Sequence, residues 1–346
     1  MTATTVPSLT PTQLYQQLQK QGFPRSFVER LLPEWWDDGL LKTSSGLLEL
    51  AVILRRRTAA ELQIGVDGRV TLAPPGQPMR FKKRSTTGEH DLHVASQLAL
   101  AIARIAVTAA PRYQPLPTDA IALRNAALAS SKRPALDFAG LVSYCWQNGV
   151  PVLFLKHLPA NRRRMAGVAL RVQQRPVVVL GYQDANPSKQ LFVLAHELGH
   201  LQRGHVADDQ LLLDERMDQI EASLRDGEND KDEVAADAYA FELLRGAAAD
   251  LVAQLPATGT ASALTLTALQ LEKHHGVDAG HLLWSYAYTS KDWVRANMAV
   301  DFLPMRKTTA FEVLETIQRE AMQQAALPPE ELNYLLTMQG FSFAKD

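Results

Sequence analysis

The sequence predicts an α+β protein with a small mixed sheet in the middle of the chain. Strand-forming residues dominate three closely spaced runs, 150–155, 165–172 and 175–182. Helical patterns dominate the chain before and after these runs. Because 346 residues exceed the usual size of one hydrophobic core, we expect more than one structural region.

The expected N-terminal region covers residues 1–88 and is mostly helical. Thr10 followed by Pro11 is typical of a helix start, because threonine caps helices and proline tolerates the first helical position. The alternating run 62–72 surrounds Asp67-Gly68, a pair that is typical of a tight β-hairpin. A small hairpin is therefore expected among these helices.

The rest of the chain is divided into a central region, 89–260, and a helical C-terminal region, 261–346. Gln173-Gln174 separates two of the strand-like runs, which favours their pairing as a hairpin. Helices are expected at 26–32, 46–57, 89–109, 118–131, 136–148, 187–204, 230–246, 262–274, 278–288, 292–299, 310–324 and 328–338.

Charge and composition narrow the function classes. The 36 basic and 37 acidic residues nearly cancel, so bulk charge does not imply a nucleic-acid partner. Cys145 is the single cysteine and lies among apolar residues, which predicts a buried, inert thiol. The N-terminus lacks a secretory pattern, and no apolar run reaches the roughly 18 residues of a membrane span. We therefore expect a cytoplasmic protein with no membrane partner.

The strongest chemical signal is the sequence His196-Glu197-Leu-Gly-His200, in the helix expected at 187–204. Residues four apart lie on one helix face, so His196 and His200 can bind one metal ion. Glu197 lies beside them and can take a proton from a water molecule that attacks a carbonyl. Apolar neighbours predict a buried helix, in which two histidines need partners for their ring nitrogens. These residues predict a Zn²⁺ site with Glu197 as catalytic base.

A catalytic zinc ion needs a third protein ligand and one open position. Glu233 is the favoured ligand because its alanine-rich helix can approach the first helix closely. Asp237 follows one turn later, where it can accept the outer N–H of a liganding histidine. The alternative is that both acids belong to the solvated acidic span 206–232. The rival ligands are Glu215, Glu221 and Glu228.

His205 is expected at the surface. It follows His200 by five residues, a rotation of about 140° on an ideal helix, which points it away from the metal. Gly204 is also expected to end the helix before it.

The chain resembles the ImmA/IrrE-type metallopeptidases, a family within the gluzincin group. The resemblance is carried by Ala195-His-Glu-Leu-Gly-His200, by Glu233 with Ala236-Asp237, and by Gly167-Val-Ala with Pro176-Val-Val-Val-Leu. It spans about a third of the chain, from 136 to 246. It implies a gluzincin-like core, zinc at His196, His200 and Glu233, and Glu197 as general base.

The same resemblance implies a substrate and a way of binding it. The strand that includes Gly167, Val168 and Ala169 would border the cleft and pair with an extended substrate segment. The substrate would be a helix-turn-helix repressor, whose cleavage releases stress or mobile-element genes. An oxyanion-stabilising residue is also expected, although each candidate can equally be structural. The candidates are His274, His281, Tyr286 and Tyr288.

A second function class stays open. The basic clusters 55–57, 82–84 and 162–164 are typical of solvated faces, but convergence on one surface would favour DNA binding. The chain would then be a DNA- or partner-binding regulatory protein with a structural or regulatory metal site. Glu197 discriminates between the two classes, because a structural zinc site needs no general base.

Overall fold

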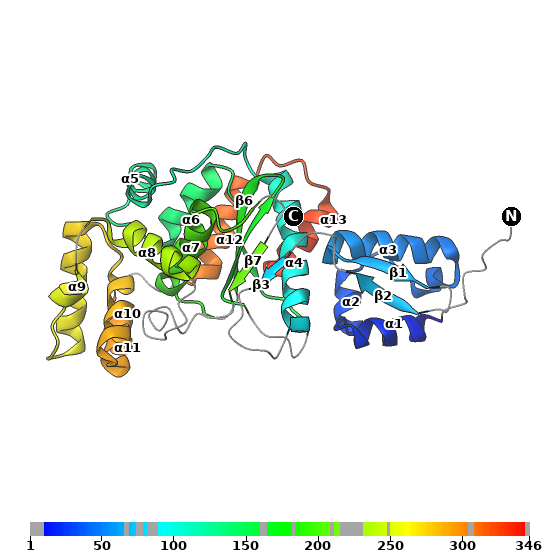
Figure 1. Cartoon of the computed structure of the whole chain (residues 1–346), viewed down its shortest axis with the longest axis horizontal. Coiled ribbons are helices and arrows are strands. Elements are labelled where there is room, and N and C mark those ends of the chain that lie inside the picture. Colours follow the sequence, from blue (N-terminus) through cyan, green and yellow to red (C-terminus); the bar gives the residue numbers. More distant parts are fainter. Residues whose placement is uncertain are drawn as a thin grey trace.

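The structure is a computed structural model with an α+β fold and a small mixed sheet, as the sequence predicted. Along its longest axis, an N-terminal group of helices, a central sheet between helices, and a further group of helices follow one another (Figure 1). The described residues are 10–65, 69–73, 79–81, 89–159, 165–181, 184–207, 211–214, 231–247, 250–303 and 308–342.

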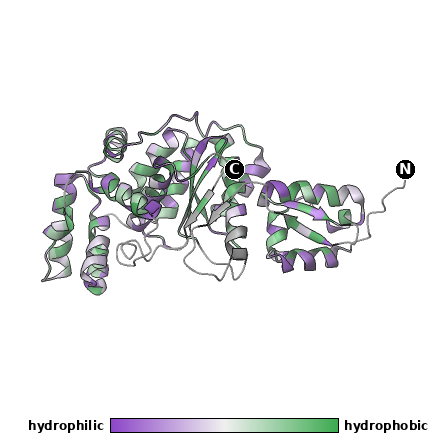
Figure 2. Cartoon of the chain, in the orientation of Figure 1, coloured by the Kyte–Doolittle hydropathy of each residue, from purple (hydrophilic) through white to green (hydrophobic). Residues whose placement is uncertain are grey.

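The N-terminal part consists of helices packed around a two-stranded hairpin. The Thr10 side chain caps α1 and Pro11 lies in its first turn, which confirms the predicted helix start. Hydrophilic and hydrophobic residues alternate along these helices (Figure 2), and most of the leucines are buried, Leu14 and Leu18 on α1 and Leu47, Leu50 and Leu54 on α3 among them. Strands β1 and β2 pair antiparallel, which confirms the hairpin, although its Asp67-Gly68 turn lies outside the described residues. The elements are α1 (Pro11–Lys20), α2 (Arg25–Leu31), η1 (Asp38–Lys42), α3 (Ser44–Thr58), β1 (Glu61–Ile64) and β2 (Val70–Ala73).

The central sheet has the strand order β3-β7-β5-β6-β4. Strand β5 runs antiparallel to both of its neighbours, whereas β3 with β7 and β4 with β6 are parallel pairs. Gln173 and Gln174 join β5 to β6 with φ values of 51° and 66°, which confirms the predicted hairpin. The strands are β3 (Met79–Phe81), β4 (Val152–Leu155), β5 (Gly167–Val172), β6 (Arg175–Gly181) and β7 (Leu211–Asp214).

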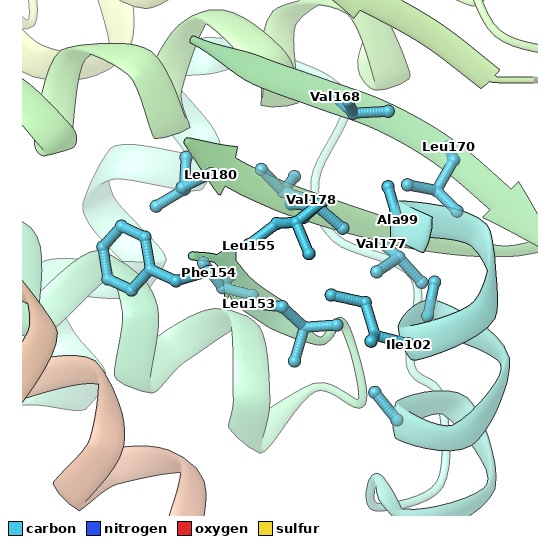
Figure 3. Packing of buried hydrophobic residues seen from close by; sticks show 14 of the residues in the cluster. Ala99, Ile102, Leu153, Phe154, Leu155, Val168, Leu170, Val177, Val178 and Leu180 are labelled. Atoms are coloured by element: carbon cyan, nitrogen blue, oxygen red, sulfur yellow. The ribbon is translucent and has the colours of Figure 1, made fainter. Parts of the chain in front are cut away.

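Helices cover both faces of the sheet (Figure 1). Helix α4 (Glu89–Ala109) packs on one face, where its Ala99 and Ile102 join Val168 and Leu170 of β5 in one buried cluster (Figure 3). On the opposite face lie α6 (Phe138–Gln147), α7 (Pro187–Gln202) and α12 (Ala310–Ala321). Because both faces are covered, the central strands are almost continuously apolar instead of alternating with polar residues.

The remaining helices pack against the helices on the sheet or against one another. Helix α8 packs against α7, and α5 packs against both α6 and α8. These helices are α5 (Ala120–Ser131), α8 (Lys231–Arg245), η3 (Val252–Gln254), α9 (Ala261–His275), α10 (Ala279–Ser290), α11 (Trp293–Asp301) and α13 (Pro329–Gln339).

The packing groups the C-terminal helices differently from the division that the sequence suggested. Helices α9, α10 and α11 share a hydrophobic core of their own, which also includes Leu251 and Leu255. Helices α12 and α13 instead return to the main core. There Phe311 packs edge-on against Phe154, with the two ring centroids 4.8 Å apart. The main core also continues into α3 through Leu50, so no break in the core marks residue 88.

Cys145 is buried in α6, as predicted, and burial raises the pKa of its thiol to about 12. None of the helices in the described ranges combines the length and the apolar character that a bilayer crossing requires.

Candidate metal centre

Helix α7 carries the histidine motif through the middle of the molecule. Asn186 caps the helix by accepting hydrogen bonds from the backbone N–H groups of Ser188 and Lys189, and Pro187 occupies the first helical position. Every residue from 190 to 201 is buried. The local sequence therefore places the motif in the core, between the sheet and α8.

His196, His200 and Glu233 meet as predicted, and together they could hold a metal ion. The Nε2 atoms of the two histidines are 3.0 Å apart. Glu233 Oε2 lies 3.4 Å from Nε2 of His196, and Glu233 Oε1 lies 3.4 Å from Nε2 of His200. Ligands that are about 2.0–2.1 Å from a tetrahedral zinc ion lie roughly 3.3 Å from one another. The three side chains therefore have the spacing of a zinc site.

The outer nitrogens of both histidines have side-chain partners of their own. Nδ1 of His196 is 2.8 Å from Asp237 Oδ1, so Asp237 contacts His196 as the sequence predicted. A carboxylate only accepts hydrogen bonds, so a neutral His196 donates from Nδ1 and keeps a lone pair on Nε2. Nδ1 of His200 lies 2.9 Å from His205. Lone pairs converging with the Glu233 carboxylate favour a positive ion between them.

Small residues allow α7 and α8 to approach closely enough for this geometry. A Cβ atom on Gly199 would lie 2.8 Å from the backbone oxygen of Ala236 and 3.0 Å from its Cα atom. Ala236 and Ala240 are fully buried in the same interface. The expectation that an alanine-rich helix carries Glu233 to the metal is consistent with this contact.

Glu197 is buried and faces the first residue of β5. A Cβ atom on Gly167 would lie 2.3 Å from Glu197 Oε1, so only glycine leaves room for this carboxylate. The structure thus brings two of the predicted site residues together. Glu197 is the candidate base, and Gly167 has no side chain and so leaves room for its carboxylate.

The predicted substrate-pairing strand needs a correction. Strand β5 is not at an edge, because β6 pairs with one side and β7 with the other. The register places Gly167 opposite Asp214 and Ala169 opposite Leu212. Gly167 meets Glu197 on the α7 face, so Val168 points the opposite way, into the core against α4. Residues 167–169 border the site, but their backbone is already paired.

The prediction that His205 lies at the surface was wrong. Gly204, with φ 76°, reverses the chain after α7, and the backbone N–H of His205 donates to the carbonyl of His200. The ring then folds back onto the His200 ring. A rotation angle on an ideal helix does not apply to His205, because α7 has already ended at this point. A helix that ends at a glycine brings the residue after the glycine back to the residue four positions before the glycine, so Gly204 could have indicated the contact of His205 with His200.

Each candidate for an oxyanion stabiliser makes its own contacts, and none belongs to the His196–His200–Glu233 group. His274 is exposed, and Tyr288 packs edge-on against Trp293. Tyr286 accepts a hydrogen bond from Arg295. His281 is buried on α10 and accepts from Arg245 Nε at 3.2 Å, and its ring stacks on Phe192.

Two further predictions concern residues of which the structure describes only some. Of the basic clusters, 82–84 and 162–164 lie outside the described residues. In the third cluster, Arg55 and Arg56 are exposed, whereas Arg57 donates to the Leu31 carbonyl. The rival ligands Glu215, Glu221 and Glu228 also lie outside the described residues.

No family model, curated protein or solved structure matches the chain. The functional assignment therefore depends on the motif residues and on the geometry of the metal centre.

Proposed function

We propose that this chain is a zinc-dependent endopeptidase with a gluzincin-like core, similar to the ImmA/IrrE-type family. One observation carries the proposal. The buried His196–His200–Glu233 group has the spacing of a zinc site, and it adjoins a second buried carboxylate, Glu197.

The donor set favours zinc among the divalent metals. Two imidazole nitrogens and one carboxylate suit this ion better than magnesium or calcium, which prefer oxygen ligands alone. When bound, zinc acts as a Lewis acid toward a peptide carbonyl and activates water for attack.

The protein's own residues supply binding and proton transfer. Glu197 would accept a proton from the attacking water and pass it to the departing amine. Asp237 would hold His196 in the tautomer that presents Nε2 to the metal. The space at Gly167 lets the Glu197 side chain, which comes from α7, keep its place against β5.

Ligand number favours catalysis over a structural role. Structural zinc sites are closed by four protein ligands, whereas catalytic sites keep one position open. Within the described ranges, the metal-binding group has three members. Three protein ligands support a catalytic metal site, and so favour the proposal of an enzyme over that of a regulatory protein with a structural metal site.

We further propose that the substrate is a helix-turn-helix transcriptional regulator, as the family resemblance implies. Strand β6 occupies one side of β5 and β7 the other. A substrate segment that pairs with β5 on the β7 side would therefore have to take the place of β7. Substrate binding and release of β7 would then be coupled.

The test compares the wild-type protein, Glu197→Gln and the matched control Glu242→Gln, each loaded with one equivalent of zinc. Glu242 is an exposed carboxylate on α8, with 54% of its side chain accessible. Each protein is incubated with a helix-turn-helix protein encoded nearby, and cleavage is followed by mass spectrometry. We expect Glu197→Gln to lose activity about 10²- to 10⁴-fold, whereas the control stays active. Equal cleavage by all three, or none by the zinc-loaded wild type, would contradict the proposal.

A further inference from the structure

The two metal-binding histidines are held from behind in different ways. Asp237 contacts His196 directly, whereas the group behind His200 is a third histidine, His205. Only 10% of the His205 side chain is exposed. His205 Nε2 in turn lies 3.6 Å from Asp232 Oδ1.

We propose that His205 is the positioning residue for His200, with Asp232 behind it, an inference that rests on the proposed zinc site. Asp232 attracts the proton of His205 to Nε2, because a carboxylate favours an N–H that faces it. Nδ1 of His205 then carries a lone pair and accepts a hydrogen bond from the N–H at His200 Nδ1. His200 is left with a lone pair on Nε2, the atom that faces the metal.

His205 is not itself a ligand in this arrangement. Its Nδ1 atom lies 2.9 Å from Nδ1 of His200, the nitrogen on the far side of that ring from His196 and Glu233. The grouping of metal-binding side chains accordingly includes His200 and leaves out both His205 and Asp232.

The arrangement also joins the two metal-bearing helices a second time. His205 follows the end of α7, and Asp232 lies in the first turn of α8, next to the ligand Glu233. Contacts that orient liganding histidines raise metal affinity by about 10- to 100-fold. Removing the His205 acceptor should therefore weaken zinc binding without removing a ligand.

Three substitutions separate the hydrogen bond from simple packing. In His205→Asn, the side-chain oxygen can occupy the place of Nδ1 and still accept from His200. In His205→Gln, the amide reaches the place of Nε2 instead, and His205→Leu keeps apolar volume but has no acceptor. Zinc affinity is measured by competition with a chromophoric chelator, and the visible spectrum of the cobalt-substituted protein reports ligand geometry.

We expect zinc to bind about 10- to 100-fold more weakly to His205→Leu and His205→Gln, with altered cobalt spectra. His205→Asn should stay within about threefold of the wild type and keep its spectrum. Circular dichroism of the metal-free proteins checks folding, and if His205→Leu does not fold, the Asn and Gln pair decides.

Three outcomes overturn the inference, and they differ in whether they also overturn the proposed zinc site. Equal zinc affinity in the wild type and all three variants, or equal weakening in all three, rejects the positioning role and leaves the zinc site intact. A wild-type protein that binds no zinc rejects the proposed function together with the inference.

Discussion

Gly167 is the residue on which the position of the candidate base depends. Its φ angle is not in the left-handed region, so the backbone alone would accept alanine. The obstacle is the Glu197 carboxylate, which occupies the space where a Cβ atom would lie. Glu197 is fully buried and would have to leave its present position.

We therefore expect Gly167→Ala to lower kcat/KM for peptide cleavage by about 10²-fold or more, while zinc stoichiometry stays at one. Steady-state kinetics and metal analysis measure the two effects. The double variant Gly167→Ala with Glu197→Gln should be no slower than Glu197→Gln alone, because both changes remove one function. Independent, multiplying effects would show that Gly167 acts in some other way.

His281 makes the stability of the protein depend on pH. Burial, followed by the charges of Arg245 and Arg124, holds the pKa of this imidazole well below its usual value of 6.5. The folded state thus leaves His281 neutral where the unfolded chain takes up a proton. Since the unfolded state then binds more protons, stability falls as the pH decreases below about 6.5.

His281→Gln should remove this loss, because its amide oxygen can still accept from Arg245 without titrating. In chelator, the free energy of unfolding of the wild type should fall by about 1.4 kcal/mol more than that of the variant between pH 7.5 and 5.5. Urea unfolding at the two pH values measures the difference. Parallel decreases in both proteins would show that His281 is protonated in the fold.

At the scale of helices, Arg124 joins three elements. From α5, its guanidinium donates to the carbonyls of Leu243 and Leu244 at the end of α8. It also donates to those of His275 and Gly276 at the end of α9. Burial lowers the pKa of this guanidinium, but the carbonyls at two helix C-termini favour its charge. The end of helix α8, which carries Glu233, is therefore fixed to its neighbours.

We expect Arg124→Met to reduce the free energy of unfolding by about 2–4 kcal/mol, because it removes this donor from the buried carbonyls of Leu243 and Leu244. Arg133→Met is the matched control, since Arg133 forms an exposed ion pair with Asp137 and should contribute less than about 1 kcal/mol. Chemical denaturation of both variants gives the comparison. Similar losses of unfolding free energy in the two variants would show that the Arg124 hydrogen bonds do not hold α5, α8 and α9 together.

Elements with strong local signals could be predicted from the sequence, and elements that depend on distant partners could not. Helix α7 has its own cap and first-turn proline, and the β5–β6 hairpin has its turn between two apolar runs. Strands β3 and β7 are short and lie more than a hundred residues apart in the sequence, yet they pair with each other. No local pattern in the acidic span predicts β7, so the sequence alone does not show that one side of β5 is already paired.

The same distinction applies to the candidate site. His196, Glu197 and His200 follow from helical spacing, and Glu233 with Asp237 follows from a second helical face. His205 depends on how the chain turns after Gly204, which a periodic argument does not include. The contact of Asp232 with His205 joins the ends of two different helices. From the sequence, Asp232 is therefore only one residue of an acidic span.

For the whole molecule, the main core is built from parts of the chain that are far apart in sequence. Helix α13 packs near α4 and α3, and its Tyr334 hydroxyl donates to the backbone carbonyl of Arg57. The backbone N–H groups of Lys156 and His157 both donate to the carbonyl of Met338 at 3.1 Å. Helices α7 and α8, which carry His196, His200 and Glu233, belong to this main core, whereas α9–α11 pack around a separate one.

A bound zinc ion should stabilise this main core, because its ligands join α7 to α8 and the unfolded chain has no such site. With free zinc at about 1,000 times its dissociation constant, the gain is about 4 kcal/mol, or roughly 5 °C in Tm. We expect a chelator to lower Tm by this amount, and zinc but not magnesium to restore it. The variant Glu233→Gln should show little of the zinc-dependent increase.

Hydrogen exchange locates the effect within the molecule. Because the ligands lie on α7 and α8, chelation should speed amide exchange in 187–202 and 231–245, whereas α11 in the separate core should change little. An unchanged Tm with chelator, or faster exchange confined to α11, would show that no metal joins these two helices. In that case His196, His200 and Glu233 would have to be explained as an ordinary buried polar cluster, and the peptidase proposal would lose its basis.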